Sequence, residues 1–212
     1  MTKVFILGAG GFGKEILDFY QDLGREKDIL GFLDENPEIE GNILNNKPIY
    51  SISKLNDYNP DDVKLVCAIG IPSKDRTKTI EKTKKAGFEY ETIIHPSARL
   101  SEWVEIGEGV IICAGSIITT QTKIGDFSIV NIGCTVAHDI VIGNYCTLSP
   151  GTNISGNVNI GNEVFFGTGA VTVQQIDIGN NSIIGAGAVV TKSIPSFSLA
   201  VGVPAKVIKK LK

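Results

Sequence analysis

The chain has 212 residues, with 20 Lys and Arg against 23 Asp and Glu and a net charge of −3. This length allows one large domain or two modest ones, and the interspersed charges present no basic face to nucleic acid or anionic lipid. We therefore expect neither nucleic acid nor a membrane as a partner. The N-terminus lacks the pattern of a signal peptide, and the four cysteines show no CxxC spacing. A cytoplasmic location with reduced, buried thiols is expected.

The first 92 residues alternate short apolar runs with helix-like stretches. The runs "KVFIL", "ILGFLD" and "KLVCAIG" are separated and followed by stretches such as "KEILDFYQDLG" and "KDRTKTIEKTKKAGF". This spacing is typical of βαβ units around a parallel sheet. The sequence therefore predicts a small Rossmann-like domain over residues 1–92, containing one βαβαβ half.

A glycine-rich stretch, "GAGGFG" at residues 8–13, lies between the first predicted strand and the first predicted helix, and Asp34 ends the next strand. Such glycines allow a diphosphate to approach a helix N-terminus, and the acid can bind a ribose hydroxyl. The pattern leaves three readings open: an NAD oxidoreductase, a mononucleotide site and a plain tight turn. Because a dinucleotide needs two mononucleotide-binding halves, and about 90 residues supply only one, the mononucleotide site is favoured.

From residue 93 the helical period gives way to a six-residue repeat. Written in sixes from Ile94 to Pro195, the sequence gives 17 hexads without an insertion, and position 1 is Ile, Leu, Val or Phe in all but one, the exception being Thr172. Position 5 is always small or β-branched. This period predicts a parallel β-helix over residues 93–212, with three hexads in each triangular coil and the position-1 side chains in its interior.

His138 and Asp139 occupy positions 3 and 4 of the hexad "VAHDIV", which places both near a corner of a coil. A histidine there can take a proton from an attacking amine or hydroxyl, and the carboxylate can fix the tautomer of its ring. The alternative is a solvated turn. A metal-dependent hydratase would need three histidines, and the chain has only two. We therefore expect no metal.

The block "IVNIGCTVAHDIVIGNYCTLSPGTNISGNVNIG", residues 129–161, resembles the hexapeptide-repeat acyltransferases typified by sialic-acid O-acetyltransferase and UDP-4-amino-sugar N-acetyltransferase. The tail "SIPSFSLAVGVPAK" resembles the closing segment of that family. The resemblance spans the whole chain, because those enzymes also carry a small nucleotide-binding domain ahead of the β-helix. It implies a left-handed β-helix, acetyl-CoA as the acetyl donor, and a homotrimer with its active sites between subunits.

The resemblance also implies roles for individual residues. His138 matches the general base, and Asp139 matches an acidic residue, usually Glu, that raises the basicity of the histidine; the side chain of Asp139 is one methylene shorter. The acetyl-CoA contacts fall on positions matching Thr147, Gly156, Thr168 and Ala186. Thr147 stands where the family often has histidine. Gly156 lies one coil beyond His138 on the same corner, where the lack of a side chain would let the cofactor pass close to the backbone.

In the N-terminal domain, the resemblance places the contacts to a nucleotide sugar on positions matching Gly10, Gly11, Phe12, Asp34, Glu35 and Gly70. Phe12 departs from a frequent histidine, which leaves the acceptor sugar open. We expect an acetyl-CoA-dependent N-acetyltransferase that acts on a nucleotide-activated amino sugar of the UDP-4-amino-4,6-dideoxy type in bacterial surface-glycan synthesis. The alternatives are a sugar O-acetyltransferase of the sialic-acid type and a non-catalytic nucleotide-sugar-binding scaffold.

Overall fold

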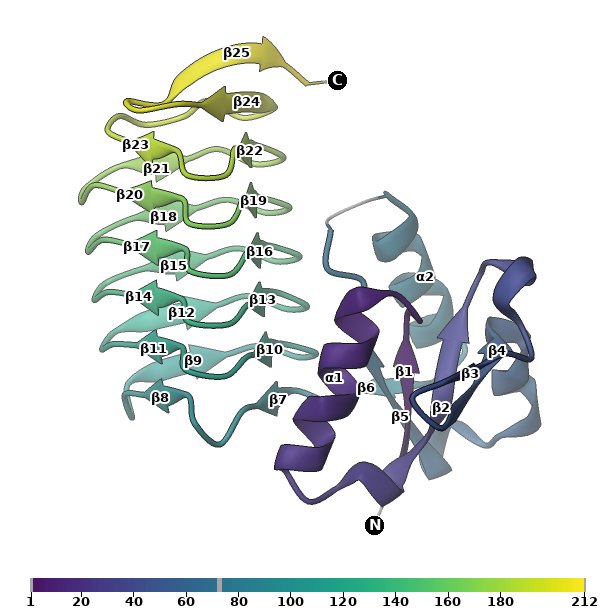
Figure 1. Ribbon diagram of the computed structural model, residues 1–212. Coiled ribbons are helices and arrows are strands. Elements are labelled where there is room, and N and C mark those ends of the chain that lie inside the picture. Colours follow the sequence, from purple (N-terminus) through teal and green to yellow (C-terminus); the bar gives the residue numbers. More distant parts are fainter. Residues whose placement is uncertain (1, 72–73, 212) are drawn as a thin grey trace. The chain divides into compact units, whose positions relative to one another are not determined.

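The computed structural model describes residues 2–71 and 74–211, and the chain divides into two compact units, residues 1–92 and 93–212 (Figure 1). The first unit is an α/β domain and the second is a β-helix. Within the described residues, no helix is both long enough and apolar enough to cross a membrane.

The N-terminal unit is built on a parallel sheet with the strand order β3-β4-β2-β1-β5-β6. Its strands are β1 (Lys3–Leu7), β2 (Ile29–Asp34), β3 (Ile43–Leu44), β4 (Lys47–Ser51), β5 (Val63–Cys67) and β6 (Glu89–Tyr90). All pairings are parallel except that between β3 and β4. The central strands are apolar and buried, as expected for a parallel sheet covered on both faces.

In the described residues of this unit, helix α1 (Gly11–Asp22) follows β1 and helix α2 (Lys74–Lys85) follows β5. Helix α1 turns Ile16, Leu17 and Tyr20 inward at helical spacing. The described part of the unit also contains the short 3₁₀ helices η1 (Glu26–Asp28), η2 (Pro37–Ile39), η3 (Ile52–Asp57) and η4 (Pro60–Asp62). The Rossmann-like fold is confirmed, but one part of the predicted βαβαβ half is wrong, since η2 and the β3–β4 hairpin replace an α-helix between β2 and β4.

A polar cluster ties α1 to the end of the N-terminal unit. The Tyr20 hydroxyl, which is fully buried, donates to Glu91 Oε2 at 2.6 Å. Arg25 contacts both Glu91 and Asp28. Burial, together with the hydrogen bond to Glu91, raises the pKa of Tyr20, so the phenol stays neutral and acts as the donor.

Changing Tyr20 to phenylalanine is expected to lower the free energy of unfolding by about 1.5–3 kcal/mol, because a hydrogen bond to a charged acceptor is lost. Urea denaturation followed by circular dichroism measures this loss. Tyr58→Phe is the matched control, since it keeps the ring contact between residue 58 and Phe5. Equal stabilities for the Tyr20→Phe variant and the wild type would contradict a stabilising role for the cluster.

The second unit is a left-handed parallel β-helix made of three sheets (Figure 1). The first sheet contains β7 (Ile93–Ile94), β10 (Ile111–Ile112), β13 (Ile129–Val130), β16 (Thr147–Leu148), β19 (Phe165–Phe166), β22 (Ile183–Ile184), β24 (Ser198–Val201) and the antiparallel β25 (Lys206–Lys210). The second contains β8 (Arg99–Leu100), β11 (Ile117–Ile118), β14 (Thr135–Val136), β17 (Asn153–Ile154), β20 (Val171–Thr172) and β23 (Val189–Val190). The third contains β9 (Val104–Ile106), β12 (Thr122–Ile124), β15 (Val141–Ile142), β18 (Asn159–Ile160) and β21 (Asp177–Ile178).

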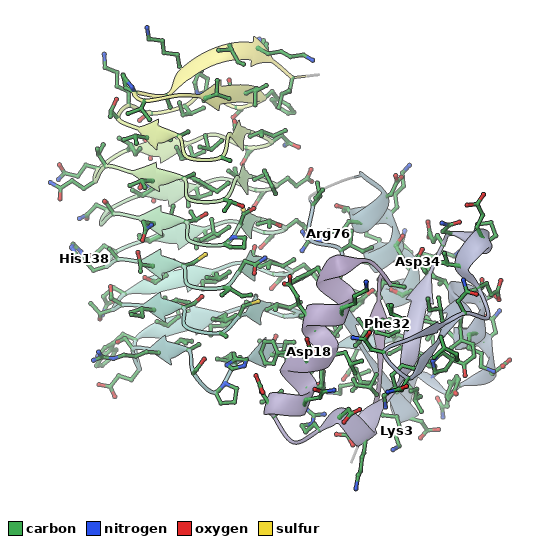
Figure 2. All side chains as sticks on the ribbon, viewed as in Figure 1. Lys3, Asp18, Phe32, Asp34, Arg76 and His138 are labelled. Carbon is green, nitrogen blue, oxygen red and sulfur yellow. The ribbon has the colours of Figure 1, made fainter. Side chains whose placement is uncertain are left out.

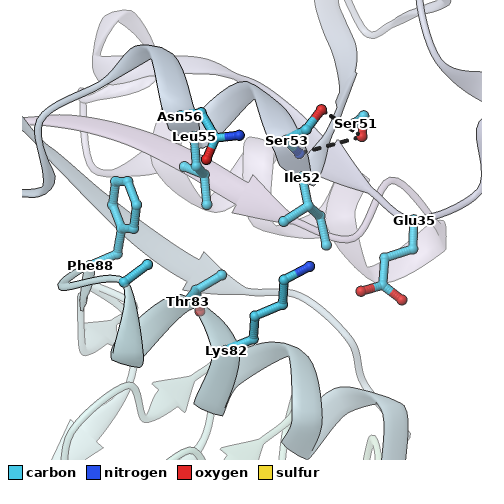
Figure 3. Close-up of a pocket in the computed structure, with 10 residues that line it drawn as sticks. Glu35, Ser51, Ile52, Ser53, Leu55, Asn56, Lys82, Thr83 and Phe88 are labelled. Carbon is cyan, nitrogen blue, oxygen red and sulfur yellow. Dashed lines mark hydrogen bonds between the residues drawn. The ribbon is translucent and has the colours of Figure 1, made fainter.

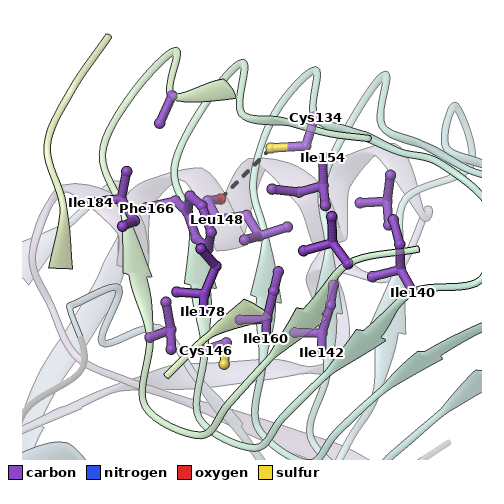
Figure 4. Close-up of a cluster of buried hydrophobic side chains, with 14 of the residues drawn as sticks. Cys134, Ile140, Ile142, Cys146, Leu148, Ile154, Ile160, Phe166, Ile178 and Ile184 are labelled. Atoms are coloured by element: carbon purple, nitrogen blue, oxygen red, sulfur yellow. Dashed lines mark hydrogen bonds between the residues drawn. The ribbon is translucent and has the colours of Figure 1, made fainter. Parts of the chain in front are cut away.

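Each hexad contributes two side chains to the interior of the β-helix (Figure 4). Position 1 is buried from Ile112 to Val190, as the repeat predicts, and position 5 is buried over the same range. Position 4 makes the turn: it has a positive φ in every hexad from Gly109 to Gly187. Glycine, asparagine and aspartate tolerate this left-handed conformation best, and several of these hexads carry one of them.

The 18-residue period ends in the last coil. Ile194 bridges to Ile178 and Leu199 pairs with Ile183, so these partners lie only 16 residues apart. The predicted unbroken repeat is therefore wrong after Val190: Ile194 lies opposite a position-1 residue and not in position 5. It is buried all the same.

All four cysteines are free and buried, and Cys134 and Cys146 lie in the β-helix interior. Burial raises the pKa of the Cys134 thiol to about 11. Because the thiolate is the reactive form, we expect no reaction of the native protein with Ellman's reagent and the release of four equivalents in urea. Fast reaction of any native thiol would contradict this.

Candidate active site

His138 and Asp139 form a hydrogen-bonded pair on the corner between β14 and β15, which is called the second–third corner from here on (Figure 2). His138 Nδ1 lies 2.7 Å from Asp139 Oδ2, and each side chain is 54% exposed. An ionised carboxylate can only accept a hydrogen bond, so this contact assigns the hydrogen to Nδ1, and in the neutral ring Nε2 carries the lone pair. The pair can therefore take up a proton at Nε2.

Asp139 is at the same time the turn residue of its hexad. Its φ is 57°, and its backbone N–H donates to Thr120 O at 3.2 Å. Asp139 is therefore both the turn residue and the partner of the His138 ring, in the same conformation. The short carboxylate does reach the ring of His138 from this backbone.

Gly156 lies on the same corner, 18 residues after His138, and it is buried. A Cβ at Gly156 would lie 2.7 Å from both Cε1 and Nε2 of His138 and 3.2 Å from Nδ1. The imidazole therefore occupies the space that the missing side chain leaves free. In this chain that space holds His138, where the sequence had suggested room for the cofactor.

The other residues predicted to contact acetyl-CoA lie elsewhere on the β-helix. Thr147 is buried in β16 of the first sheet. Thr168 and Ala186 are exposed and lie one coil apart on the corner between the first and second sheets, which is called the first–second corner from here on. A single chain therefore brings His138 together with Gly156, but places Thr168 and Ala186 on a different corner.

The glycines of the glycine-rich loop in the N-terminal unit have two different roles: some shape the turn, and others leave the backbone exposed. Gly8 has a φ of +106°, and a Cβ at Gly13 would collide with the carbonyl oxygen of Gly8, so these two glycines shape the turn. Gly10 and Gly11 are exposed, and a Cβ on either would meet nothing within 4 Å. They lie at the start of α1, where backbone N–H groups and the helix dipole favour an anion.

The remaining predicted substrate residues gather around this loop. Asp34 Oδ2 accepts from the Ala9 N–H at 2.8 Å, so Asp34 ties the end of β2 to the loop. Glu35 is exposed and accepts from the Thr79 hydroxyl at 3.0 Å. The ring of Phe12 packs beside Gly70, where a Cβ would lie 3.6 Å from Phe12 Cδ1. All six predicted residues thus lie near the carboxyl ends of β1, β2 and β5.

Among the residues that the structure describes, several cavities open at this edge of the sheet, and α2 helps to line the two described here. One has a volume of about 500 Å³ and is lined by Glu35, Ser51, Ile52, Ser53, Leu55, Asn56, Lys82, Thr83, Ala86 and Phe88 (Figure 3). The other, of about 120 Å³, includes Asp34 and Arg76 among its lining residues. Arg76, Thr79 and Thr83 of α2 are buried, although charged and hydroxyl side chains are usually exposed.

No group of three or more His, Cys, Asp or Glu side chains that could hold a metal ion occurs among the residues that the structure describes.

The chain is similar to known protein families and to solved structures. The model of the PglD N-terminal domain matches residues 3–83, and that of the bacterial transferase hexapeptide (six repeats) matches residues 121–156. A mutant perosamine N-acetyltransferase from Caulobacter crescentus, solved with CoA and GDP-perosamine, is 32% identical, covers 99% of this chain and 98% of its own, and has a TM-score of 0.89. The acetyltransferase domain of PglB from Neisseria gonorrhoeae, solved with acetyl coenzyme A, is 33% identical, with coverages of 97% and 98% and a TM-score of 0.90.

WeeI from Acinetobacter baumannii is 32% identical, covers 98% of this chain and 100% of its own, and has a TM-score of 0.90. A search of curated proteins gives no match. The solved relatives nevertheless match along almost the whole chain and above 30% identity, which confirms the resemblance found in the sequence. The protein therefore belongs to the family of hexapeptide-repeat acetyltransferases that carry a PglD-type N-terminal domain.

Proposed function

We propose that this acetyltransferase moves the acetyl group of acetyl-CoA to the amine of a nucleotide-linked amino sugar, with His138 as the general base. The observation that carries the proposal is the pair at the second–third corner, where Asp139 holds Nδ1 and Nε2 remains available as the acceptor of a proton. Similarity along the whole chain to N-acetyltransferases solved with CoA and GDP-perosamine supports an amine as the acceptor. The product would be an acetamido sugar for a bacterial surface glycan.

In the proposed reaction, the sugar amine attacks the thioester carbonyl carbon. A C–N bond forms, the C–S bond breaks, and the amine proton passes to His138 Nε2. The protonated His138 then returns that proton to the departing thiolate, which leaves as free coenzyme A. Asp139 accepts the Nδ1 hydrogen bond throughout, and this bond strengthens as the ring gains charge.

The N-terminal unit would hold the nucleotide. The exposed N–H groups of Gly10 and Gly11 at the start of α1 suit a diphosphate, while Asp34 and Glu35 at the end of β2 suit the ribose. We propose a UDP-linked 4-amino-4,6-dideoxy sugar as the acceptor, and one solved relative was crystallised with a GDP-linked sugar. The release of free coenzyme A, measured with UDP-, dTDP- and GDP-linked amino sugars and with free sialic acid, tests acceptor and nucleotide together. Release with sialic acid alone would favour O-acetylation, and no release with any acceptor would favour a scaffold.

We further propose a homotrimer whose sites lie between neighbouring β-helices. The residues proposed to bind acetyl-CoA at the first–second corner, Thr168 and Ala186, lie apart from His138 within one chain, so a second chain would have to complete the site. Exposed apolar residues on the outer surface, such as Ile117, Ile132 and Val141, suit such contacts.

Light scattering is expected to give about three times the chain mass of 22.6 kDa. Mixed assemblies give a second test of the shared site. If two chains share each site, refolding the His138→Ala protein with a Thr168→Trp protein should restore part of the activity that each lacks alone. A monomeric mass with full activity would contradict the proposal.

A further inference from the structure

We propose that Gly156 is a positioning residue for His138, and that Thr172 and Ser155 hold the turn on which the imidazole lies. This inference rests on the proposed function, in which His138 takes up the proton. Gly156 then serves the base, because the imidazole of His138 occupies the space that a side chain at residue 156 would fill.

The imidazole of His138 packs against Gly156 of the next coil. Gly156 is buried although it lies on a corner, and the ring atoms Cε1 and Nε2 of His138 occupy the place of its Cβ. The Asn157 N–H donates to His138 O at 3.0 Å, which fixes the two backbones to each other. The ring is therefore held on one side by Gly156 and at Nδ1 by Asp139.

The backbone before Gly156 departs from the regular ladder of the β-helix. At the same corner in the neighbouring coils, the position-2 N–H donates to the position-1 carbonyl of the next coil, as Ala137 does to Ile154 and Val173 to Val190. The Ser155 N–H instead donates to Thr172 Oγ1 at 3.1 Å, and Ser155 Oγ donates to Thr172 O at 2.7 Å. The hydroxyl groups of both residues are thus built into the ladder at this one coil.

This arrangement accounts for the exception in the repeat. Thr172 is the only position-1 residue among the hexads that is not apolar, and it is buried. A buried hydroxyl is tolerated when it is hydrogen-bonded, and here its oxygen accepts from the turn that carries Gly156. The one polar side chain in the position-1 column therefore supports Ser155, the residue directly before Gly156.

The first test is Gly156→Ala. Because the φ of Gly156 lies outside the left-handed region, alanine fits the backbone, and the strain falls on the ring of His138. Moving a catalytic group by about 1 Å costs about 100-fold in rate, so we expect kcat to fall by about that factor while KM for acetyl-CoA stays within about twofold. In a His138→Ala background, Gly156→Ala should change kcat no further. A raised KM for acetyl-CoA with unchanged kcat, or an equal loss in both backgrounds, would overturn the proposal in favour of a cofactor contact.

Two further variants separate positioning from general disruption. Gln174→Ala is the matched control, since Gln174 holds the same hexad position on this corner one coil later and is exposed; its kcat should equal that of the wild type. Thr172→Val keeps the size and burial of residue 172 but removes the acceptor of the Ser155 N–H, and it should lower kcat in the same direction as Gly156→Ala. Should Gly156→Ala fail to fold, an unchanged kcat in folded Thr172→Val would overturn the proposal.

Ring ¹⁵N spectra give a readout that does not depend on activity. The chain has only two histidines, so the His138→Ala spectrum assigns both rings. In the wild type we expect the Nδ1–H tautomer for His138, and in Gly156→Ala a loss of that preference, with His95 unchanged. Spectra of His138 that are identical in both proteins would overturn the inference. If no acceptor sugar were acetylated, this measurement would still decide the positioning of the ring separately from the proposed function.

Discussion

Replacing His138 with alanine is expected to lower kcat/KM for acetyl transfer by about 10²- to 10⁴-fold, the usual contribution of a positioned general base. The loss should appear mainly in kcat, because the ring takes part in the transfer of a proton and the nucleotide is bound by the other unit in the proposed function. The free energy of unfolding should change little, since the side chain is 54% exposed and lies outside the apolar interior.

The measurement is the initial rate of coenzyme A release with saturating acceptor. His95→Ala is the matched control: His95 is the only other histidine, and its Nδ1 bonds within its own turn to Ser97. It should keep the wild-type rate. Full activity in His138→Ala would remove the proposed base from the mechanism.

Replacing Asp139 with asparagine is expected to lower kcat by about ten- to a hundredfold, because a charge-assisted hydrogen bond worth about 1.5–3 kcal/mol is lost. Asparagine tolerates the left-handed backbone that Asp139 adopts, so the turn should persist. Its amide can also donate to Nδ1, which would favour the tautomer with the hydrogen on Nε2 and block the uptake of a proton there.

Asp139→Glu is the partner experiment, because it keeps the charge and lengthens the side chain by one methylene. We expect more activity from this variant than from Asp139→Asn, measured by the same assay, with thermal unfolding as the check on folding. Equal activity in wild type, Asp139→Asn and Asp139→Glu would show that Asp139 serves only the turn.

Much of the β-helix was predictable because its period fixes which positions face inward. Ile112, Val136 and Ile160 are interior because they share a phase, and their neighbours need not be known. The shortened last coil was not predictable, since Ile194 is buried in either register and the sequence looks the same for both.

The candidate site shows the same division. The phase of the hexads placed His138 and Asp139 on a corner, and the glycine pattern placed Gly10 and Asp34 at one sheet edge. The contact between the His138 ring and Gly156 depends on the direction of a side chain between two coils. The spacing of residues in the sequence does not predict that direction. The burial of Arg76 depends on how α2 packs on the sheet, and its charge argues against burial.

The most direct test of His138 as the general base is a crystal structure of the protein with coenzyme A and the nucleotide-linked amino sugar that it acetylates. We predict that the sugar amine lies about 2.6–3.2 Å from His138 Nε2, the reach of a general base, with Asp139 on Nδ1 and the ring still seated on Gly156. An amine bound away from the second–third corner, or a His138 ring turned away from the bound amine, would contradict the role of His138 as the general base.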